Sequence, residues 1–287
     1  HAEFLGIMTR AEMLASFIVH DDDGWRLKGH AREPYYRWLA SWAMSLNMPS
    51  DLGYSNDGYI LPPLTVDTVF VDCDYRPPGQ LFVTSLKGVT ERSRVRKATV
   101  VDRVEAAVEQ ARMEPDRQWI FWCDRNDEGR LAARALRGFL AGGVVLVEGP
   151  DDPESKADAL CAFADGKSQA LVTKPSIAAH GLNLQSCSRM AFIGLSDSWE
   201  RFFQAIRRCW RFGPPDPVHA YVVLSEMERP ILENVMRKDR EASEMARELV
   251  RYVAEFEKAE IALVRPDETY APKVEMRVPA WLRGTMP

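Results

Sequence analysis

The stretch Gln118-Trp-Ile-Phe-Trp-Cys123, followed by Val144-Val-Leu-Val-Glu148, decides the fold. Both runs are almost wholly apolar, which is typical of strands that are buried on both faces of a sheet. A helical pattern over residues 126–140 separates them. The alternation continues, with helices expected over 101–112, 153–164 and 198–209 and strands over 169–173, 189–193 and 218–224. Apolar strands alternating with helices predict an α/β domain whose mostly parallel sheet is covered by helices on both faces.

The segments around this domain follow other patterns. Residues 1–62 are expected to be mostly helical, and 33–46 carry an apolar stripe typical of a packing face, formed by Tyr35, Trp38, Leu39, Trp42 and Leu46. Residues 65–73 alternate like a strand, and residues 74–97 read as a loop-rich connector. A long helix is expected from about residue 229 to 262. The predicted domain boundaries are therefore 1–62, 63–97, 98–262 and 263–287.

Composition narrows the class of protein. The formal net charge of −5 argues against a protein that coats nucleic acid through bulk charge, although a local basic groove remains compatible with it. No apolar run reaches the length of a membrane span, so we expect a cytoplasmic protein without membrane contact. The cysteines lack any C-x-x-C pair, and we expect reduced thiols and no metal site: Cys73, Cys123, Cys161, Cys187 and Cys209.

The stretch Gln204-Ala-Ile-Arg-Arg-Cys-Trp-Arg-Phe-Gly213 places a glutamine and two arginines at positions i, i+4 and i+7. On a helix this spacing puts Gln204, Arg208 and Arg211 on one face. The guanidinium is always charged, and its fork of donors suits phosphate oxygens. The pattern therefore predicts a device that reaches a triphosphate. The alternative is a cationic helix face in contact with solvent only.

A second candidate stretch is Thr173-Lys-Pro-Ser-Ile-Ala-Ala-His-Gly-Leu-Asn-Leu-Gln185, which begins where a predicted strand ends. In open parallel sheets, ligands bind outside the carboxyl ends of the strands. Gly181 would let backbone amides approach a phosphate closely. The alternative is that the Gly-Leu-Asn-Leu turn only joins two elements.

Both stretches resemble motifs of superfamily 2 helicases, of the Swi/Snf type and closest to those of phages and prophages. Gly181-Leu-Asn-Leu184 resembles motif V, the pattern from Gln204 to Gly213 resembles motif VI, and the strand at 118–123 stands where motif IV does. Leu61-Pro-Pro-Leu64 resembles the crossing between the two motor lobes. The resemblance implies a RecA-like, P-loop NTPase-like second lobe, preceded by the helical tail of the first lobe.

The resemblance also implies the chemistry. The protein would be the C-terminal portion of an ATP-dependent DNA helicase or translocase, with ATP and Mg²⁺ bound between this lobe and an N-terminal lobe. Arg211 would be the arginine finger and Arg208 its ATP-contacting partner. The implied ATP-binding residues are Gln204, Gly181, Asn183, Arg208 and Arg211. The implied DNA-backbone contacts are Thr173, Lys174, Ser176 and, more weakly, Arg125, with the neighbouring Asn126 as a possible helix N-cap.

The sequence departs from the family pattern in important places. It has no G-x-x-x-x-G-K-[ST] and no Asp-Glu-x-His in a strand context, so both would belong to a lobe upstream of His1 and the isolated chain is expected to be inactive. Pro214 stands where many relatives have glutamine. One alternative is a non-catalytic DNA-binding or assembly module. Another is an unrelated doubly wound enzyme, for which residues 123–129 make a poor phosphate loop. Trp199, His180 and His219 are expected to be structural.

Overall fold

The computed structural model describes residues 1–21, 24–73, 89–179, 181–213 and 216–261. The chain contains two compact units, one made of Asp57–Arg240 and the other of His1–Asn56 with the chain from Glu241 onward. The long helix α9 (Arg229–Ile261) therefore contributes to both units. The predicted boundaries gave all of this helix to the lobe. None of the described helices has the length and apolarity needed to cross a membrane.

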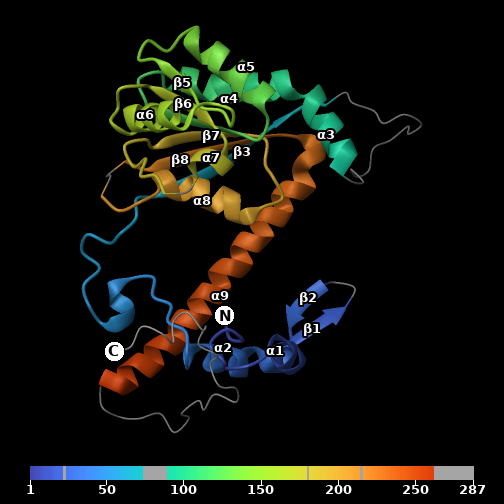
Figure 1. Ribbon diagram of the computed structural model, residues 1–287, viewed down its shortest axis with the longest axis vertical. Coiled ribbons are helices and arrows are strands. Elements are labelled where there is room, and N and C mark those ends of the chain that lie inside the picture. Colours follow the sequence, from blue (N-terminus) through green and yellow to red (C-terminus); the bar gives the residue numbers. More distant parts are fainter. Residues whose placement is uncertain (22–23, 74–88, 180, 214–215, 262–287) are drawn as a thin grey trace, which may run out of the picture. The chain divides into compact units, whose positions relative to one another are not determined.

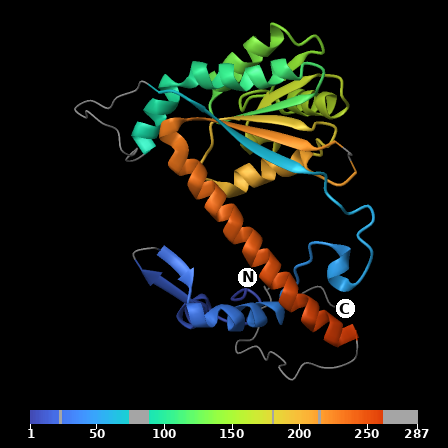
Figure 2. The same ribbon diagram turned by 180° about the vertical axis from the view of Figure 1, so that it is seen from behind.

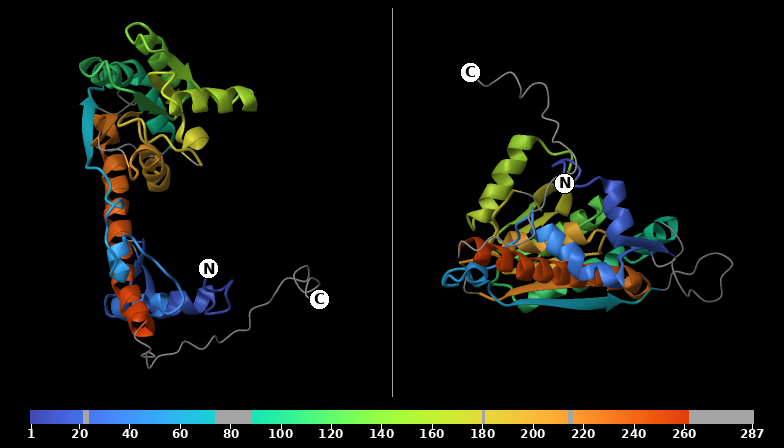
Figure 3. Two further views of the ribbon diagram at one scale, coloured as in Figure 1. Left: turned by 90° about the vertical axis from the view of Figure 1, so that its left-hand side faces the viewer. Right: turned by 90° about the horizontal axis from the view of Figure 1, so that it is seen from below.

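The unit Asp57–Arg240 is built on a six-stranded sheet with the order β3-β8-β7-β4-β6-β5 (Figure 1). Every strand pair in it is parallel. The strands are β3 (Leu64–Val71), β4 (Trp119–Cys123), β5 (Val144–Leu146), β6 (Ala170–Thr173), β7 (Arg189–Ile193) and β8 (Val218–Ser225). β3 forms one edge, where it runs beside β8 (Figure 2) and along the margin of the unit in both views of Figure 3. The predicted parallel sheet is confirmed.

Helices cover both faces of this sheet because the central strands are apolar on both sides. From β4, Trp119, Phe121 and Cys123 enter one core with α4 (Val100–Met113) and α5 (Asn126–Arg137). Ile120 and Trp122 enter the other core. That second core is closed by α6 (Pro153–Ala164), α7 (Pro175–Ala178), α8 (Trp199–Cys209) and the start of α9. Figure 1 shows α4 and α5 above the strands and α8 below them.

The connector prediction for residues 74–97 is wrong at its end, because Val89–Ala98 forms a helix, α3. Residues 74–88 lie outside the described residues. The sequence of α3 is dominated by charge and lacks an apolar stripe, which is why its pattern suggested a loop. Its anchors are the fully buried Val95 and the largely buried Arg96.

The smaller unit combines short helices with a hairpin. The helices are α1 (Arg10–Phe17), η1 (Gly29–Ala31), α2 (Arg32–Ala40) and η2 (Pro49–Leu52), and β1 (Ile18–Asp21) pairs antiparallel with β2 (Gly24–Leu27). The hairpin is a departure from the expectation of a mostly helical segment. α2 ends at Ala40 although its apolar pattern extends to Leu46. The expected packing role of the stripe is met by Trp38, whose ring stacks on Phe17 at 5.2 Å between centroids.

Candidate functional site

Helix α8 carries Gln204 and Arg208, the first two of the three residues predicted to reach a triphosphate. Ser198 caps its start by accepting a hydrogen bond from the Arg201 amide, 3.3 Å away. Gln204 and Arg208 then lie one turn apart on a partly exposed side. The opposite side enters the core through Phe202, Ala205, Ile206 and Cys209. The helix ends at Cys209, so Arg211 lies beyond its last turn, which corrects the expectation that all three residues share one helical face.

Arg208 joins α8 to the loop that follows α7. Its Nη1 donates to the carbonyl of Leu182 at 3.0 Å, and its Nη2 donates to Oε1 of Gln204 at 3.1 Å. In return, the amide of Leu184 donates to the carbonyl of Arg208 at 3.0 Å. The structure therefore brings the two predicted motifs together, with Arg208 as the link. Partial burial lowers the pKa of Arg208, and the nearby Arg211 lowers it further.

Arg211 is exposed, and among the described residues its side chain has no hydrogen bond or ion pair. Arg207 lies against two aromatic rings, 5.5 Å from the centroid of Phe203 and 5.3 Å from that of Trp210. Burial lowers the pKa of Arg207, with smaller contributions from Arg211 and Arg208. In the described part of the chain no carboxylate pairs with any of these three guanidiniums. The end of α8 is therefore a concentrated positive charge that suits an anion.

The loop around Gly181 is open to solvent. Gly181 has a φ of +76°, a conformation that favours glycine, and apart from its chain neighbours no atom of the described residues lies within 4 Å of where a Cβ would be placed. Asn183 is exposed nearby in the chain. It lines a surface pocket together with Ala164, Gln185, Ser186 and Gly213. The predicted nucleotide-binding residues on this loop are thus accessible to a ligand.

The predicted DNA contacts divide into accessible and inaccessible residues. Thr173 is fully buried, and its Oγ1 donates to the carbonyl of Val147 at 3.1 Å, so its side chain cannot reach a phosphate at the surface. Ser176 is exposed and Lys174 is partly exposed. Arg125 is already bound in bidentate fashion by the Asp127 carboxylate, with Nε–Oδ1 and Nη2–Oδ2 distances of 2.9 Å. Arg125, not its neighbour Asn126, is the N-cap residue of α5.

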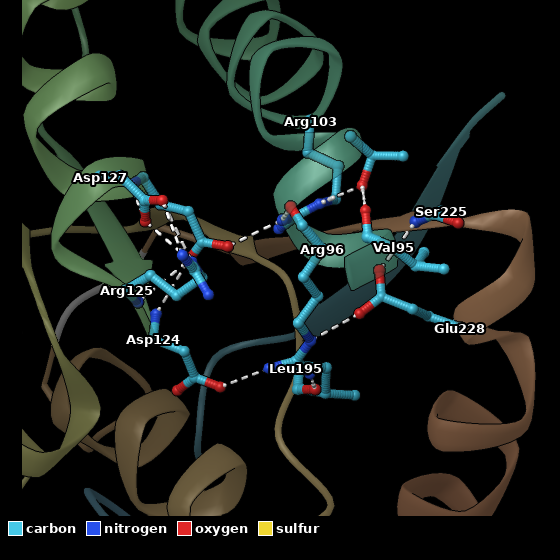
Figure 4. Close-up of polar contacts among 11 residues, drawn as sticks. Val95, Arg96, Arg103, Asp124, Arg125, Asp127, Leu195, Ser225 and Glu228 are labelled. Atoms are coloured by element: carbon cyan, nitrogen blue, oxygen red, sulfur yellow. Dashed lines mark hydrogen bonds and ion pairs between the residues drawn. The ribbon is translucent and has the colours of Figure 1, made fainter. Parts of the chain in front are cut away.

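A cluster of charges at the carboxyl ends of β4, β7 and β8 was not predicted (Figure 4). Arg96 of α3 donates through Nε to Oε1 of Glu228 at 2.7 Å and through Nη1 to Oδ2 of Asp124 at 3.1 Å. Its Nη2 donates to the carbonyl of Leu195. Glu228 is fully buried and also accepts the amide of Ser225 at 3.1 Å. One guanidinium therefore holds the ends of three neighbouring strands.

A buried ion pair lies beside this cluster. Nη2 of Arg103 donates to Oε1 of Glu128 at 2.8 Å, and the two side chains are 0% and 1% exposed. Oε2 of Glu128 accepts the amides of Asp124 and Arg125 at the start of α5. Burial raises the pKa of Glu128, and the charge of Arg103 opposes that shift. The pair fixes the loop after β4, next to the predicted motif IV strand.

Trp199 and His219, which were expected to be structural, both contact neighbouring side chains. Trp199 stacks on Phe203 at 5.0 Å and donates through Nε1 to Asp239 at 2.8 Å, so its expected packing role is confirmed. His219 contacts Asp67 and Tyr221. His180 and Pro214 lie outside the described residues. Across the described residues, no group of three or more His, Cys, Asp or Glu side chains could hold a metal ion.

The Gly181 loop, Gln204, Arg208 and Arg211 lie in a segment that matches a known domain family. Residues 102–213 match the helicase conserved C-terminal domain. The matched segment runs from within α4 to Gly213 and so includes β4, the Gly181 loop and all of α8. The parallel sheet covered on both faces is the α/β architecture that the resemblance implied. No curated protein matches the chain.

Solved structures similar to this chain include an ATPase domain and two DEAD-box proteins. The C-terminal part of the Fun30 ATPase domain is 13% identical, with 46% of this chain and 45% of that one covered and a TM-score of 0.42. A DEAD box protein from Methanococcus jannaschii is 16% identical, with 48% and 36% covered and a TM-score of 0.41. The yeast DEAD-box splicing factor Prp28 is 12% identical, with 63% and 34% covered and a TM-score of 0.45. The chain spans less than half the length of each.

Proposed function

We propose that the unit Asp57–Arg240 is the second motor lobe of an ATP-dependent DNA helicase or translocase of the Swi/Snf type, encoded by a bacterium or a phage and working in the cytoplasm. The observation that carries the proposal is the arrangement at the end of α8. There, Arg208 is tied to the Gly181 loop while Arg211 stays exposed and unpaired among the described residues. Their location inside a helicase C-terminal domain supports a nucleotide as the ligand.

In this proposal the two arginines have different tasks. Arg208, fixed by the carbonyl of Leu182 and by Gln204, holds the Gly181 loop and one side of the nucleotide. Arg211 is free to reach the γ-phosphate, where an arginine finger can raise the rate of phosphoryl transfer by about 10³–10⁵-fold because the reaction depends on positioning and charge stabilisation. Gly181 and Asn183 offer accessible polar groups to the same ligand.

ATP and Mg²⁺ need further residues that this sequence does not contain. Bound Mg²⁺ neutralises the β- and γ-phosphate oxygens. The phosphate-binding lysine and the magnesium-holding carboxylates would come from an N-terminal lobe, since the sequence has no G-x-x-x-x-G-K-[ST]. The residues present fit one half of a nucleotide site, because they supply positive charge that no carboxylate in the described residues pairs with and an open loop at Gly181. The described residues contain no cluster of side chains that could hold the metal ion.

DNA would be held mainly through its phosphates, by Lys174 and Ser176 after β6. Arg125 would join them only by releasing Asp127, which makes it a weaker candidate. Thr173 is not part of the proposed DNA surface, because its hydroxyl is buried and already donates to Val147.

The experiment is the substitution Arg211→Ala in the full-length protein, with DNA-stimulated ATP hydrolysis and DNA binding both measured. We expect turnover to be lost and DNA affinity to change by less than about threefold, because the finger acts on the transition state. The matched control is Arg201→Ala, an exposed arginine on the first turn of α8, which should leave turnover unchanged. Retained turnover in Arg211→Ala would refute the assignment.

A second candidate function is a non-catalytic DNA-binding or assembly module. The absence of a phosphate-binding lysine motif from the sequence favours it for this chain taken alone. Binding of a short DNA duplex and ATP hydrolysis, measured on both the 287-residue chain and the full-length protein, separate the two cases. DNA binding without hydrolysis in the chain, together with hydrolysis in the full-length protein, is the outcome that the main proposal predicts.

A further inference from the structure

The loop between β7 and α8, residues 194–198, is held from one side by α3. Arg96 donates to the carbonyl of Leu195, and Nη1 of Arg92 lies 2.6 Å from Oδ2 of Asp197. Arg92 and Arg96 are four residues apart, so both project from the same side of α3. This loop ends at Ser198, the residue that caps α8.

The same loop is held from the other side by α9. Nζ of Lys238 donates to the carbonyl of Asp197 at 3.0 Å, and Oδ1 of Asp239 accepts a hydrogen bond from Trp199 at 2.8 Å. Trp199 is the first residue of α8. The start of α8 is therefore fixed by side chains from two helices that are distant in the sequence.

The α3 contacts differ in strength. Arg96 has a 17% exposed side chain, and it cannot leave Leu195 without also breaking its ion pair with the fully buried Glu228. Such a charge is costly to leave without its partner. The Arg92–Asp197 pair is 35% and 55% exposed, and exposed pairs contribute little. Arg96 thus anchors α3, and Arg92 adds a weaker and more exposed contact.

We propose that α3 is a positioning element for the arginines at the other end of α8. Arg92 and Arg96 fix the position of residues 194–198, and these residues fix the first turn of α8. The helix then positions Arg208 in its last turn and, through the cap residue Trp210, Arg211 just beyond its end. A hydrogen-bonded helix transmits a shift of its first turn along its length, because its packed side chains have few alternative arrangements. The proposal rests on the function proposed above for these two arginines.

The arginines of α3 differ in whether they contact this loop. Arg94, on the same helix, is exposed and has no hydrogen bond or ion pair within the described ranges. The arginines that do face the loop contact one main-chain carbonyl and one carboxylate on either side of Ser196. This arrangement fixes the direction in which the chain leaves β7, and so the direction of α8.

The test uses the exposed pair, because Arg96→Ala would leave Glu228 buried without its partner and could unfold the lobe. The variants are Arg92→Asp, Asp197→Arg and the double variant that exchanges the charges, with Arg94→Asp as the matched control. In the full-length protein, each single change should lower the kcat of DNA-stimulated ATP hydrolysis by about fivefold and leave KM for ATP within about twofold. The charge exchange should restore kcat, and Arg94→Asp should not change it.

Hydrogen–deuterium exchange of residues 196–203 in the 287-residue chain gives a second readout. The single variants should speed exchange there by about fivefold, a size expected for an exposed pair, and the double variant should reverse the effect. Unchanged exchange in the single variants, or a double variant that restores neither readout, overturns the proposal. If the wild-type protein hydrolyses no ATP, the proposed function fails. The exchange measurements then decide separately whether α3 holds α8.

Discussion

Nη1 of Arg208 and the carbonyl oxygen of Leu182 are joined by a 3.0 Å hydrogen bond across 26 residues of sequence. This bond makes the Gly181 loop and the end of α8 one structural unit. Arg211, three residues further along, has no such contact within the described ranges. Substitutions of Arg208 and Arg211 should therefore differ in their effect on the stability of the chain as well as in their effect on ATP turnover.

Arg208→Ala should destabilise the chain by about 1–2 kcal/mol, because it leaves the carbonyl of Leu182 and the side chain of Gln204 without their donor. Arg211→Ala should stay within about 0.5 kcal/mol of the wild type, because its side chain is exposed. Urea unfolding of the 287-residue chain measures both changes. Equal destabilisation by the two substitutions would contradict the division of roles.

Arg103→Met should cost about 3 kcal/mol, because it leaves the carboxylate of Glu128 charged and buried. The deficit should shrink as pH falls. Burial already raises the pKa of Glu128, and without Arg103 protonation removes the unpaired charge at a still higher pH. Adding Glu128→Gln to Arg103→Met should recover part of the loss. Urea unfolding between about pH 5 and pH 8 checks this; a deficit that does not depend on pH would show that charge burial is not its cause.

The sheet could be predicted from the sequence because its signal is local. Each central strand is a run of apolar residues between polar loops. Because these strands are buried on both faces, their residues do not alternate between apolar and polar, and the whole run is recognisable as a buried strand. The neighbourhood of the Gly181 loop and α8 was also predictable, since both follow strands of one parallel sheet.

The contacts of α3 could not be predicted in this way. Arg96 and Glu228 are 132 residues apart, and the helix is stabilised by ion pairs that leave no periodic apolar pattern. The prediction that Thr173 contacts the DNA backbone failed for a related reason. The sequence places it at the end of a strand, but only the neighbouring strand shows that its hydroxyl is turned toward the carbonyl of Val147. Side-chain direction depends on partners that the local sequence does not specify.

Glu114→Gln should destabilise the chain near neutral pH and have no effect in strong acid. Arg189 donates through Nε to both oxygens of Glu114, at 2.8 and 2.9 Å, and this hydrogen bonding lowers the pKa of the carboxyl group. A lowered pKa means that the stabilisation is present above the ordinary glutamate value of 4.5 and is lost as pH falls through the folded-state value.

The expected size is about 0.5–1 kcal/mol, because the carboxylate is partly exposed to solvent. Thermal unfolding of both proteins at several pH values from about 2.5 to 7 measures it. Glu109→Gln serves as the control, since its pair with Arg112 is more than half exposed on both sides. A difference between Glu114→Gln and the wild type that persists in strong acid would rule out the ion pair as its origin.

Gly194→Ala should be far more damaging than the same change at another left-handed glycine. Gly194 has a φ of +87°, and a Cβ there would lie 2.8 Å from Nη1 of the buried Arg103. Gly166 has a φ of +75°, and apart from its chain neighbours no atom of the described residues lies within 4 Å of a Cβ placed there, so Gly166→Ala should cost only the backbone strain of about 1–2 kcal/mol. Gly194→Ala adds to that a displaced guanidinium whose partner, Glu128, cannot follow it without releasing the amides of Asp124 and Arg125. We expect a total of about 3 kcal/mol or more. Urea unfolding of the two variants side by side gives the comparison, and equal losses would mean that Arg103 yields without cost.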